Sequence, residues 1–260
     1  MEPQYFLISF LASTLGAVSG IGGGVIIKPT LDTFSSLSVP TISFLSGCTV
    51  LAMTIATLLR SRNLGIKLDK RTSLLLALGS IFGGLAGTSL FELMLAQTGS
   101  EQAVGALQSI LLAVMVFGVL LFLLFKKRIT PKKNTNTPLT LVIGLILGGI
   151  AAFLGIGGGP INIVVLYLAF SMNAKEAALN SIYIIFLSQS ASLLLTIAGG
   201  LVPPFQPAIL ITMIIGGITG GISGTFITRR ISLPGVDRVF GAVLFIILGL
   251  SVYNFIQLAG

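Results

Sequence analysis

Long uncharged stretches separate short polar segments along the whole chain. They contain no Asp, Glu, Lys or Arg, and each is about as long as, or longer than, the roughly 20 residues that cross a bilayer as a helix. The stretches are residues 3–27, 33–59, 72–91, 102–125, 134–174, 177–228 and 239–260. This pattern predicts an all-α polytopic membrane protein, because a helix pairs its own backbone polar groups in lipid.

Three segments of the first half recur in the same order in the second half, at offsets of 135 to 137 residues. Such a repeat predicts two related transmembrane units, residues 1–130 and 131–260. The repeated pairs are GIGGG at 20–24 and 155–159, the glycine-rich run at 79–88 and 216–225, and Gly-Ala at 105–106 and 241–242.

The distribution of basic residues indicates how the halves face. Eight simple transmembrane helices, arranged as 4+4, would place ten Lys and Arg on the side of the termini and five on the other. If each GIGGG is instead the tip of a re-entrant helical hairpin, fourteen lie on one face and Lys28 alone lies away from it. The positive-inside rule favours the second arrangement. It consists of two inverted repeats with both termini outside, and the eight-helix count is the alternative.

In the inverted arrangement each half has one glycine-broken hairpin and three transmembrane helices. The predicted hairpins are residues 5–36 and 139–171. The predicted crossings are 41–59, 72–95, 102–125, 177–198, 207–228 and 236–258.

Three consecutive glycines in an apolar span interrupt a helix at a cost of about 1 kcal/mol per residue relative to Ala. A helix that restarts after such a break directs unpaired N–H groups and the positive end of its dipole into the protein. Two such ends meeting from opposite sides favour an anion. The alternative is a tight kink that serves close packing. The candidate binding glycines are Gly22, Gly23, Gly24, Gly157, Gly158 and Gly159.

The paired GIGGG segments, Pro29 shortly after the first, and a small polar second helix in each half resemble the sulfite exporter TauE/SafE family. The resemblance covers essentially the whole chain. It implies a transporter of a small, often sulfur-containing anion such as sulfite, thiosulfate or a sulfonate, without fixing the substrate or the direction. In relatives the position of Lys28 is usually aliphatic, as it is at Ile163 in the second half.

Lys28 follows the first glycine break by about one turn. An ionisable residue inside a membrane protein is a functional candidate, whereas the alternative is a lysine that extends to the outer interface beside Asp32. Hydroxyl and amide groups of the second helices could donate hydrogen bonds to an oxyanion, and interhelical hydrogen bonding is their alternative role. The favoured polar candidates are Ser46, Thr49, Asn162, Asn180, Ser181 and Gln189.

Glycines four residues apart on each third helix share one face, so we expect them to allow close helix packing. They are Gly79, Gly83, Gly87, Gly216, Gly220 and Gly224.

We interpret the net charge of +8 as a signal for orientation in the membrane rather than for nucleic-acid binding, because the basic residues cluster between apolar runs. The chain has no His and only Cys48, and no cluster of carboxylates lies within the spans, so we expect neither an enzyme nor a cofactor or metal. The prediction is a multi-pass protein of the cell (inner) membrane that moves a small anion by alternating access. The expected partners are that anion and the lipid bilayer, with a possible homodimer and no nucleic acid. An anion channel and a non-transporting membrane assembly factor are the alternatives.

Overall fold

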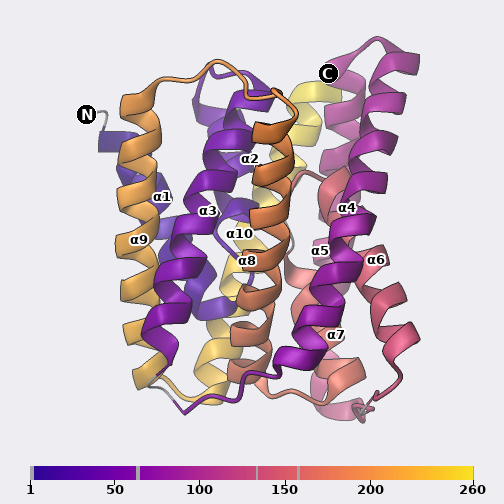
Figure 1. Ribbon diagram of the computed structural model, residues 1–260, viewed down its shortest axis with the longest axis vertical. Helices are drawn as coiled ribbons and strands as arrows, with labels where there is room; N and C mark the ends of the chain where they lie inside the picture. The colour runs from indigo at the N-terminus through magenta and orange to yellow at the C-terminus, as the bar shows by residue number, and fades with distance from the viewer. Residues whose placement is uncertain (1–2, 63–64, 133, 157–158, 260) are drawn as a thin grey trace.

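The computed structural model describes residues 3–62, 65–132, 134–156 and 159–259, and within these ranges the chain is helical without a strand (Figure 1). This confirms the all-α class. The helices are α1 (Pro3–Ser19), α2 (Gly24–Phe34), α3 (Val39–Ser61), α4 (Lys70–Thr98), α5 (Glu101–Phe125), α6 (Thr137–Phe153), α7 (Pro160–Phe170), α8 (Ala174–Ala198), α9 (Pro207–Arg230) and α10 (Leu233–Ala259), with a short 3₁₀ turn at Lys126–Arg128.

Six helices of the described chain, α3, α4, α5, α8, α9 and α10, are long and apolar enough to cross a membrane. They are the six crossings predicted from the uncharged stretches, with ends that differ by a few residues. Many large apolar side chains on them are exposed, such as Phe82, Val114 and Phe245. In water such a surface would be unfavourable, whereas in a bilayer it faces lipid, so the helices fit a multi-pass membrane protein.

The two glycine segments break the remaining apolar regions into helix pairs. Gly20, Gly22 and Gly155 have φ values of +77°, +81° and +65°, a left-handed conformation that favours glycine. After the breaks, α2 and α7 each have only 11 residues. In Figure 1 the pair α1–α2 extends from the end that carries both chain termini, and the pair α6–α7 extends from the opposite end. The entry of these pairs into a bilayer from opposite sides stays a prediction.

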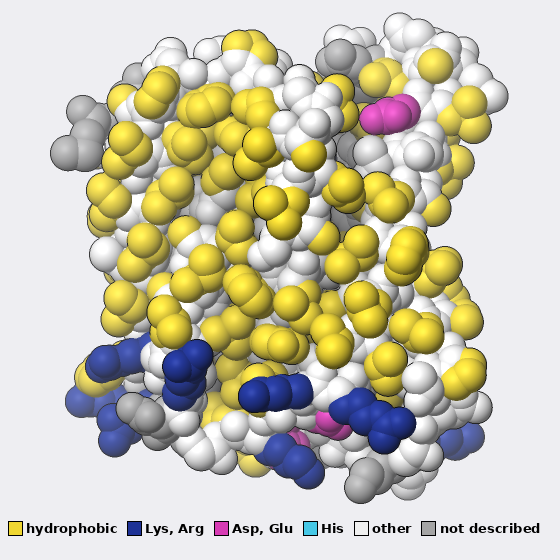
Figure 2. Space-filling view, viewed as in Figure 1, with side chains coloured by type: hydrophobic (Ala, Val, Ile, Leu, Met, Phe, Trp, Pro, Cys, Tyr) yellow, Lys and Arg dark blue, Asp and Glu magenta, His cyan; other side chains and the backbone are white. Residues whose placement is uncertain are grey.

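Basic side chains gather at the end of the molecule opposite the termini, which we call the basic end (Figure 2). Arg60 and Arg230 lie in the last turns of α3 and α9, and Lys70 begins α4. Lys126 pairs with Asp237 at 2.8 Å between Nζ and Oδ1. We call the other end, which carries the two chain termini, the terminal end.

The largest helix contacts join one half to the other. The glycines of α4 lie against the backbone of α6, and those of α9 lie against α1. A Cβ at Gly83 would collide with the Leu145 carbonyl, and one at Gly220 would come within 2.5 Å of the Phe10 carbonyl. The predicted packing role of Gly79, Gly83, Gly87, Gly216, Gly220 and Gly224 is therefore confirmed. The helices α4 and α9 therefore each pack against the first helix of the glycine-broken pair in the opposite half.

Candidate functional site

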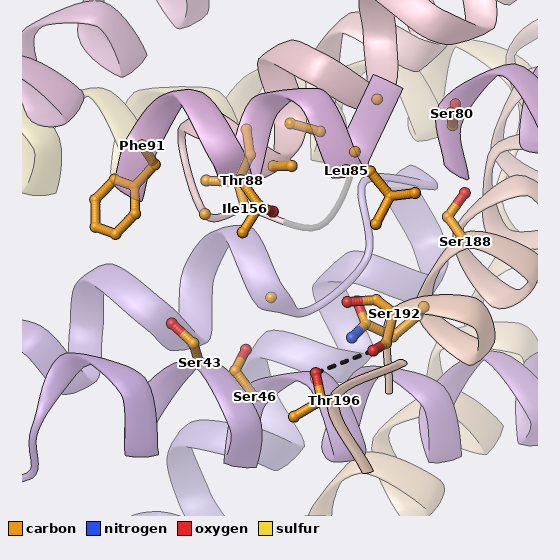
Figure 3. Close-up of a pocket in the computed structure, with 18 of the residues that line it drawn as sticks. Ser43, Ser46, Ser80, Leu85, Thr88, Phe91, Ile156, Ser188, Ser192 and Thr196 are labelled. Atoms are coloured by element: carbon orange, nitrogen blue, oxygen red, sulfur yellow. Dashed lines mark hydrogen bonds between the residues drawn. The ribbon is translucent and has the colours of Figure 1, made fainter. Parts of the chain in front are cut away.

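A cavity of about 660 Å³ lies between α3, α4 and α8. Figure 3 shows Ser43 and Ser46 on one wall, Ser188, Ser192 and Thr196 on a second, and Leu85, Thr88 and Phe91 opposite. The volume lies within the range typical of small-molecule sites.

The cavity runs from the middle of the protein to the terminal end. Its deep lining includes Gly24, at the start of α2, and Gly155, in the break between α6 and α7. Its outer lining includes Pro40 near the start of α3, Leu95 near the end of α4 and Leu201 after α8. The cavity is therefore a one-sided vestibule whose floor is built from both glycine segments.

Both helices that start at this floor lack a side-chain cap. The N-caps of α2 and α7 are Gly23 and Gly159, and neither makes a side-chain hydrogen bond to its helix. By contrast, α3, α4, α5, α6 and α8 are capped by Ser or Asx side chains. A Cβ on Gly159 would lie 3.1 Å from Val25, so the two uncapped starts are close together. Uncapped helix starts carry partial positive charge and attract anions.

Lys28 adds a basic side chain to the cavity lining. Its side chain is 8% exposed, and its Nζ lies against Gly155 of the opposite half. Asp32, one turn later on α2, attracts the ammonium group but forms no ion pair with it within 4 Å. Lys28 Nζ also has no hydrogen-bond partner among the described residues. The side chain thus lies in the protein interior rather than at the outer interface.

Three polar side chains near the floor also lack a hydrogen-bond partner among the described residues. Ser46 is 6% exposed and Asn162 is 3% exposed, and both line the cavity together with Gln189. A Cβ on Gly24 would lie 3.5 Å from Ser46 Oγ, and one on Gly47 would lie 2.6 Å from Gln189 Nε2. Ser188 Oγ is likewise buried without a partner. Unpaired polar groups around a central cavity are typical of a site that completes its hydrogen bonds with a ligand.

The structure places the other predicted site residues away from the cavity. Thr49 Oγ1 donates to the Leu45 carbonyl at 2.8 Å, and its own backbone packs against Gly217 of α9. Ser181, on α8, is fully buried and does not line the cavity. Gly22, Gly23 and Gly159 support the floor without lining the cavity. The remaining two, Gly157 and Gly158, lie outside the described residues.

Asn180 forms a seal at the basic end rather than part of the cavity. Its Oδ1 accepts hydrogen bonds from the Asp69 backbone at 2.9 Å and from Ser73 Oγ at 2.8 Å. Its Nδ2 donates to the carbonyls of Lys67 at 3.1 Å and Glu176 at 2.8 Å. Three of these four hydrogen bonds join α8 to α4 and the segment that leads into it, and the fourth, to Glu176, lies within α8.

Several residues that line the cavity are not among the binding residues predicted from the sequence. On α4 and α8 they are small or hydroxyl residues at a spacing of four, which places them on one helix face. That spacing is the sequence signal that could have identified them. The two series are Ser80, Gly84 and Thr88, and Ser188, Ser192 and Thr196.

Six long apolar helices, with a cavity between three of them that contains hydroxyl and amide side chains, fit a membrane transport protein. The chain belongs to the sulfite exporter TauE/SafE family, whose family model matches residues 5–251. The resemblance carried by the GIGGG segments is thereby confirmed.

A curated relative has similar length and covers nearly the same region. It is described as "Probable membrane transporter protein YunE" of Bacillus subtilis (strain 168), is 24% identical over 267 residues, and the match covers 93% of each chain. A comparison with solved structures gave no significant match.

Proposed function

We propose that this protein transports a small sulfur-containing oxyanion across the cell membrane by alternating access, with the anion bound at the floor of the cavity. The observation that carries the proposal is Lys28, a buried cation that lines the cavity without an anionic partner at ion-pair distance. Burying a charge costs several kcal/mol unless another charge or strong hydrogen bonds compensate. A bound anion would supply that compensation.

The other groups at the floor suit an oxyanion. Ser46 can donate one hydrogen bond, and the amides of Asn162 and Gln189 can each donate two. The uncapped starts of α2 and α7 add positive potential without a further charge. Sulfite, thiosulfate and small sulfonates all present several oxygens to such donors. Described residues at the floor include no carboxylate that would repel them, since Glu92 is exposed on α4 nearer the mouth.

The shape of the cavity favours a transporter over a channel. A channel needs a continuous path, whereas this vestibule ends at the glycine segments and the Asn180 hydrogen bonds seal the region toward the basic end. A cavity open to one side at a time is what alternating access requires. A membrane assembly factor would have no need for a buried, unpaired cation facing this cavity.

Binding of sulfite to the purified protein tests the proposal. In Lys28→Met the apolar stem is kept and the charge is lost, so we expect sulfite to bind about 10- to 100-fold more weakly, since a hydrogen bond to a charged group contributes roughly 1.5–3 kcal/mol. The unliganded variant should unfold at the same or a higher temperature, because an unpaired buried charge has been removed. Calorimetry and thermal shift measure both effects.

Lys126→Met is the matched control, because Lys126 pairs with Asp237 at the basic end, outside the cavity. It removes the same charge and should bind sulfite like the unmodified protein. Equal sulfite affinity in Lys28→Met and the unmodified protein would contradict the proposed site.

A further inference from the structure

A second, much smaller crevice lies at the basic end, where α3, α8 and α9 meet. Its volume is about 10 Å³, compared with about 660 Å³ for the cavity, so it has room for one water molecule at most. Ser61 and Thr228 line it, each next to an arginine of the basic end. The crevice is therefore closed in this structure.

The crevice and the cavity occupy corresponding positions in the two halves. The N-caps of α3 and α8, Ser38 and Asn173, are 135 residues apart, and those of α4 and α9, Asp69 and Gln206, are 137 apart. These are the offsets of the sequence repeat. At an offset of 135, three of the four crevice residues on α8 are equivalent to cavity residues on α3. The pairs are Pro40 and Lys175, Ser43 and Ala178, and Gly47 and Ile182.

The cavity wall formed by α8 and the segment after it also has equivalent residues in the crevice. All three crevice residues on α3 and the segment after α3 are equivalent to cavity residues on this wall. Among the crevice residues, Leu179 on α8 is the exception, because its equivalent on α3, Phe44, does not line the cavity. The pairs are Ser192 and Thr57, Thr196 and Ser61, and Leu201 and Ile66.

The remaining walls complete the correspondence. Both crevice residues on α9 are equivalent to cavity residues on α4, and the crevice residue on α1 is equivalent to a cavity residue on α6. The pairs are Thr88 and Thr225, Phe91 and Thr228, and Ala152 and Ala17. A correspondence on four helices indicates that the crevice is the collapsed counterpart of the cavity.

Two buried hydroxyls lie on α1 and α8, helices that also contribute residues to the crevice. Ser13 and Ser181 are both fully buried, and neither Oγ has a hydrogen-bond partner in the described part of the chain. A Cβ on Gly23 would lie 3.2 Å from Ser13 Oγ, so this hydroxyl is next to the first glycine break. A buried hydroxyl without a partner costs about 1–3 kcal/mol. These two hydroxyls therefore have no favourable role in the closed arrangement.

The sequence repeat indicates what Ser13 and Ser181 do in another conformation. Ser181 is the equivalent of Ser46, and Ser13 is the equivalent of Gly148, and both equivalents line the cavity. In a conformation with the crevice open, Ser13 and Ser181 would face its interior as Ser46 now faces the cavity.

We propose that the crevice, together with Ser13 and Ser181, is the inward-facing half of the anion pathway, closed here and opened when the two halves exchange conformations. The inference rests on the proposed function. Lys175 lies at the edge of the crevice and provides a positive charge at its entrance. The Asn180 hydrogen bonds, adjacent to Leu179 of the crevice, are the contacts that must break as it opens.

Cysteine labelling in membrane vesicles tests this pathway. Cys48 is first replaced by Ala, and single cysteines are introduced as Thr57→Cys in the crevice and Ser192→Cys at the equivalent position of the cavity. Val119→Cys is the control, because Val119 is buried on α5 outside both sites. The probe is a membrane-impermeant anionic thiol reagent, applied to inside-out and right-side-out vesicles with and without sulfite.

We expect the Thr57→Cys variant to react from the inside at least about 10-fold faster than Val119→Cys, and sulfite to change that rate. The Ser192→Cys variant should react from the outside. If Thr57→Cys reacts as slowly as Val119→Cys under all conditions while Ser192→Cys reacts normally, the inner pathway is not at the crevice and the inference is wrong.

A bulky substitution provides a second readout. Ala178→Trp should fill the crevice and abolish sulfite flux in proteoliposomes while sulfite still binds from the outside. Ala198→Trp, on the exposed part of α8, is the control and should transport normally. Full flux in Ala178→Trp would overturn the inference. Equal sulfite affinity in Lys28→Met and the unmodified protein would instead contradict the proposed function. The labelling rates would still show whether the crevice opens.

Discussion

Lys28, on the helix after the first glycine break, places its ammonium group directly against Gly155 in the second break. The two residues belong to opposite halves of the chain, so the only cation at the cavity floor in the described structure is positioned by a contact between the halves. Gly155 has φ of +65°, and its lack of a side chain leaves the space that Lys28 Nζ occupies.

Gly155→Ala should therefore displace Lys28. The new Cβ would collide with Nζ, and the left-handed backbone would add about 1–2 kcal/mol of strain. We expect sulfite affinity, measured by calorimetry, to fall at least about 10-fold. Gly200→Ala is the control, because Gly200 has φ of +66° but no atom within 4 Å of an added Cβ. It should show the strain as a lower unfolding temperature and bind sulfite normally, and equal affinities in both variants would contradict this prediction.

Gly83→Ala should destabilise the whole fold. An added Cβ would collide with the Leu145 carbonyl, so α4 and α6 would have to separate, at a cost of about 1–3 kcal/mol. Gly118→Ala, on α5, has open space around the added Cβ and should stabilise by about 0.5–1 kcal/mol. Thermal unfolding in detergent measures both. Similar changes in the two variants would show that close approach of α4 and α6 is not what Gly83 provides.

Asn180→Leu should favour the inward-facing conformation. Leu is the residue at the equivalent position, Leu45, and it removes the three hydrogen bonds that join Asn180 to α4 and the segment before it. Each contributes about 0.5–1.5 kcal/mol, so the balance between conformations should shift by roughly 1.5–4.5 kcal/mol. The expected readout is faster labelling of Thr57→Cys from the inside.

Ser190→Ala is the control for this seal, because Ser190 Oγ donates only to the Phe186 carbonyl of its own helix. Its labelling rate should not change. A drop in the unfolding temperature of Asn180→Leu without faster labelling would show that Asn180 stabilises the fold and does not control opening.

The inverted arrangement predicts which ends face outward. Cysteines at Gln257, near the end of α10, and at Ser232, between α9 and α10, are both at exposed positions. In a Cys48→Ala background we expect Gln257→Cys to react with an impermeant maleimide on intact cells, and Ser232→Cys to react only after permeabilisation. The eight-helix alternative predicts the reverse for both positions, so this experiment decides between them.

Much of the fold could be predicted from the sequence because lipid imposes strong rules on it. Uncharged runs located the six long helices, and the glycine spacing identified the packing faces. The glycine breaks and the polar second helices also predict five residues that line the cavity. They are Gly24, Lys28, Ser46, Asn162 and Gln189.

The rest of the candidate site depends on tertiary contacts, which the spacing of residues along the sequence does not reveal. Asn180 and Thr49 have the same polar character as Ser46, but the first faces α4 and the second faces α9. The choice between a cavity face and a contact face is made by the neighbouring helix. Likewise, the sequence repeat gave two equivalent halves, whereas the structure shows a large cavity in one position and a closed crevice in the other.

The reciprocal packing of α4 on α6 and α9 on α1 has a consequence for how such a chain could have arisen. Because the helix pair of each half is held by the third helix of the other, a single half expressed alone would leave its glycine face uncovered. We therefore expect that neither half folds alone. If the halves enter the membrane in opposite orientations, as the inverted arrangement predicts, an ancestral gene encoding one half would have needed to insert its product in both orientations, and fusion of two copies would have fixed those orientations within one polypeptide.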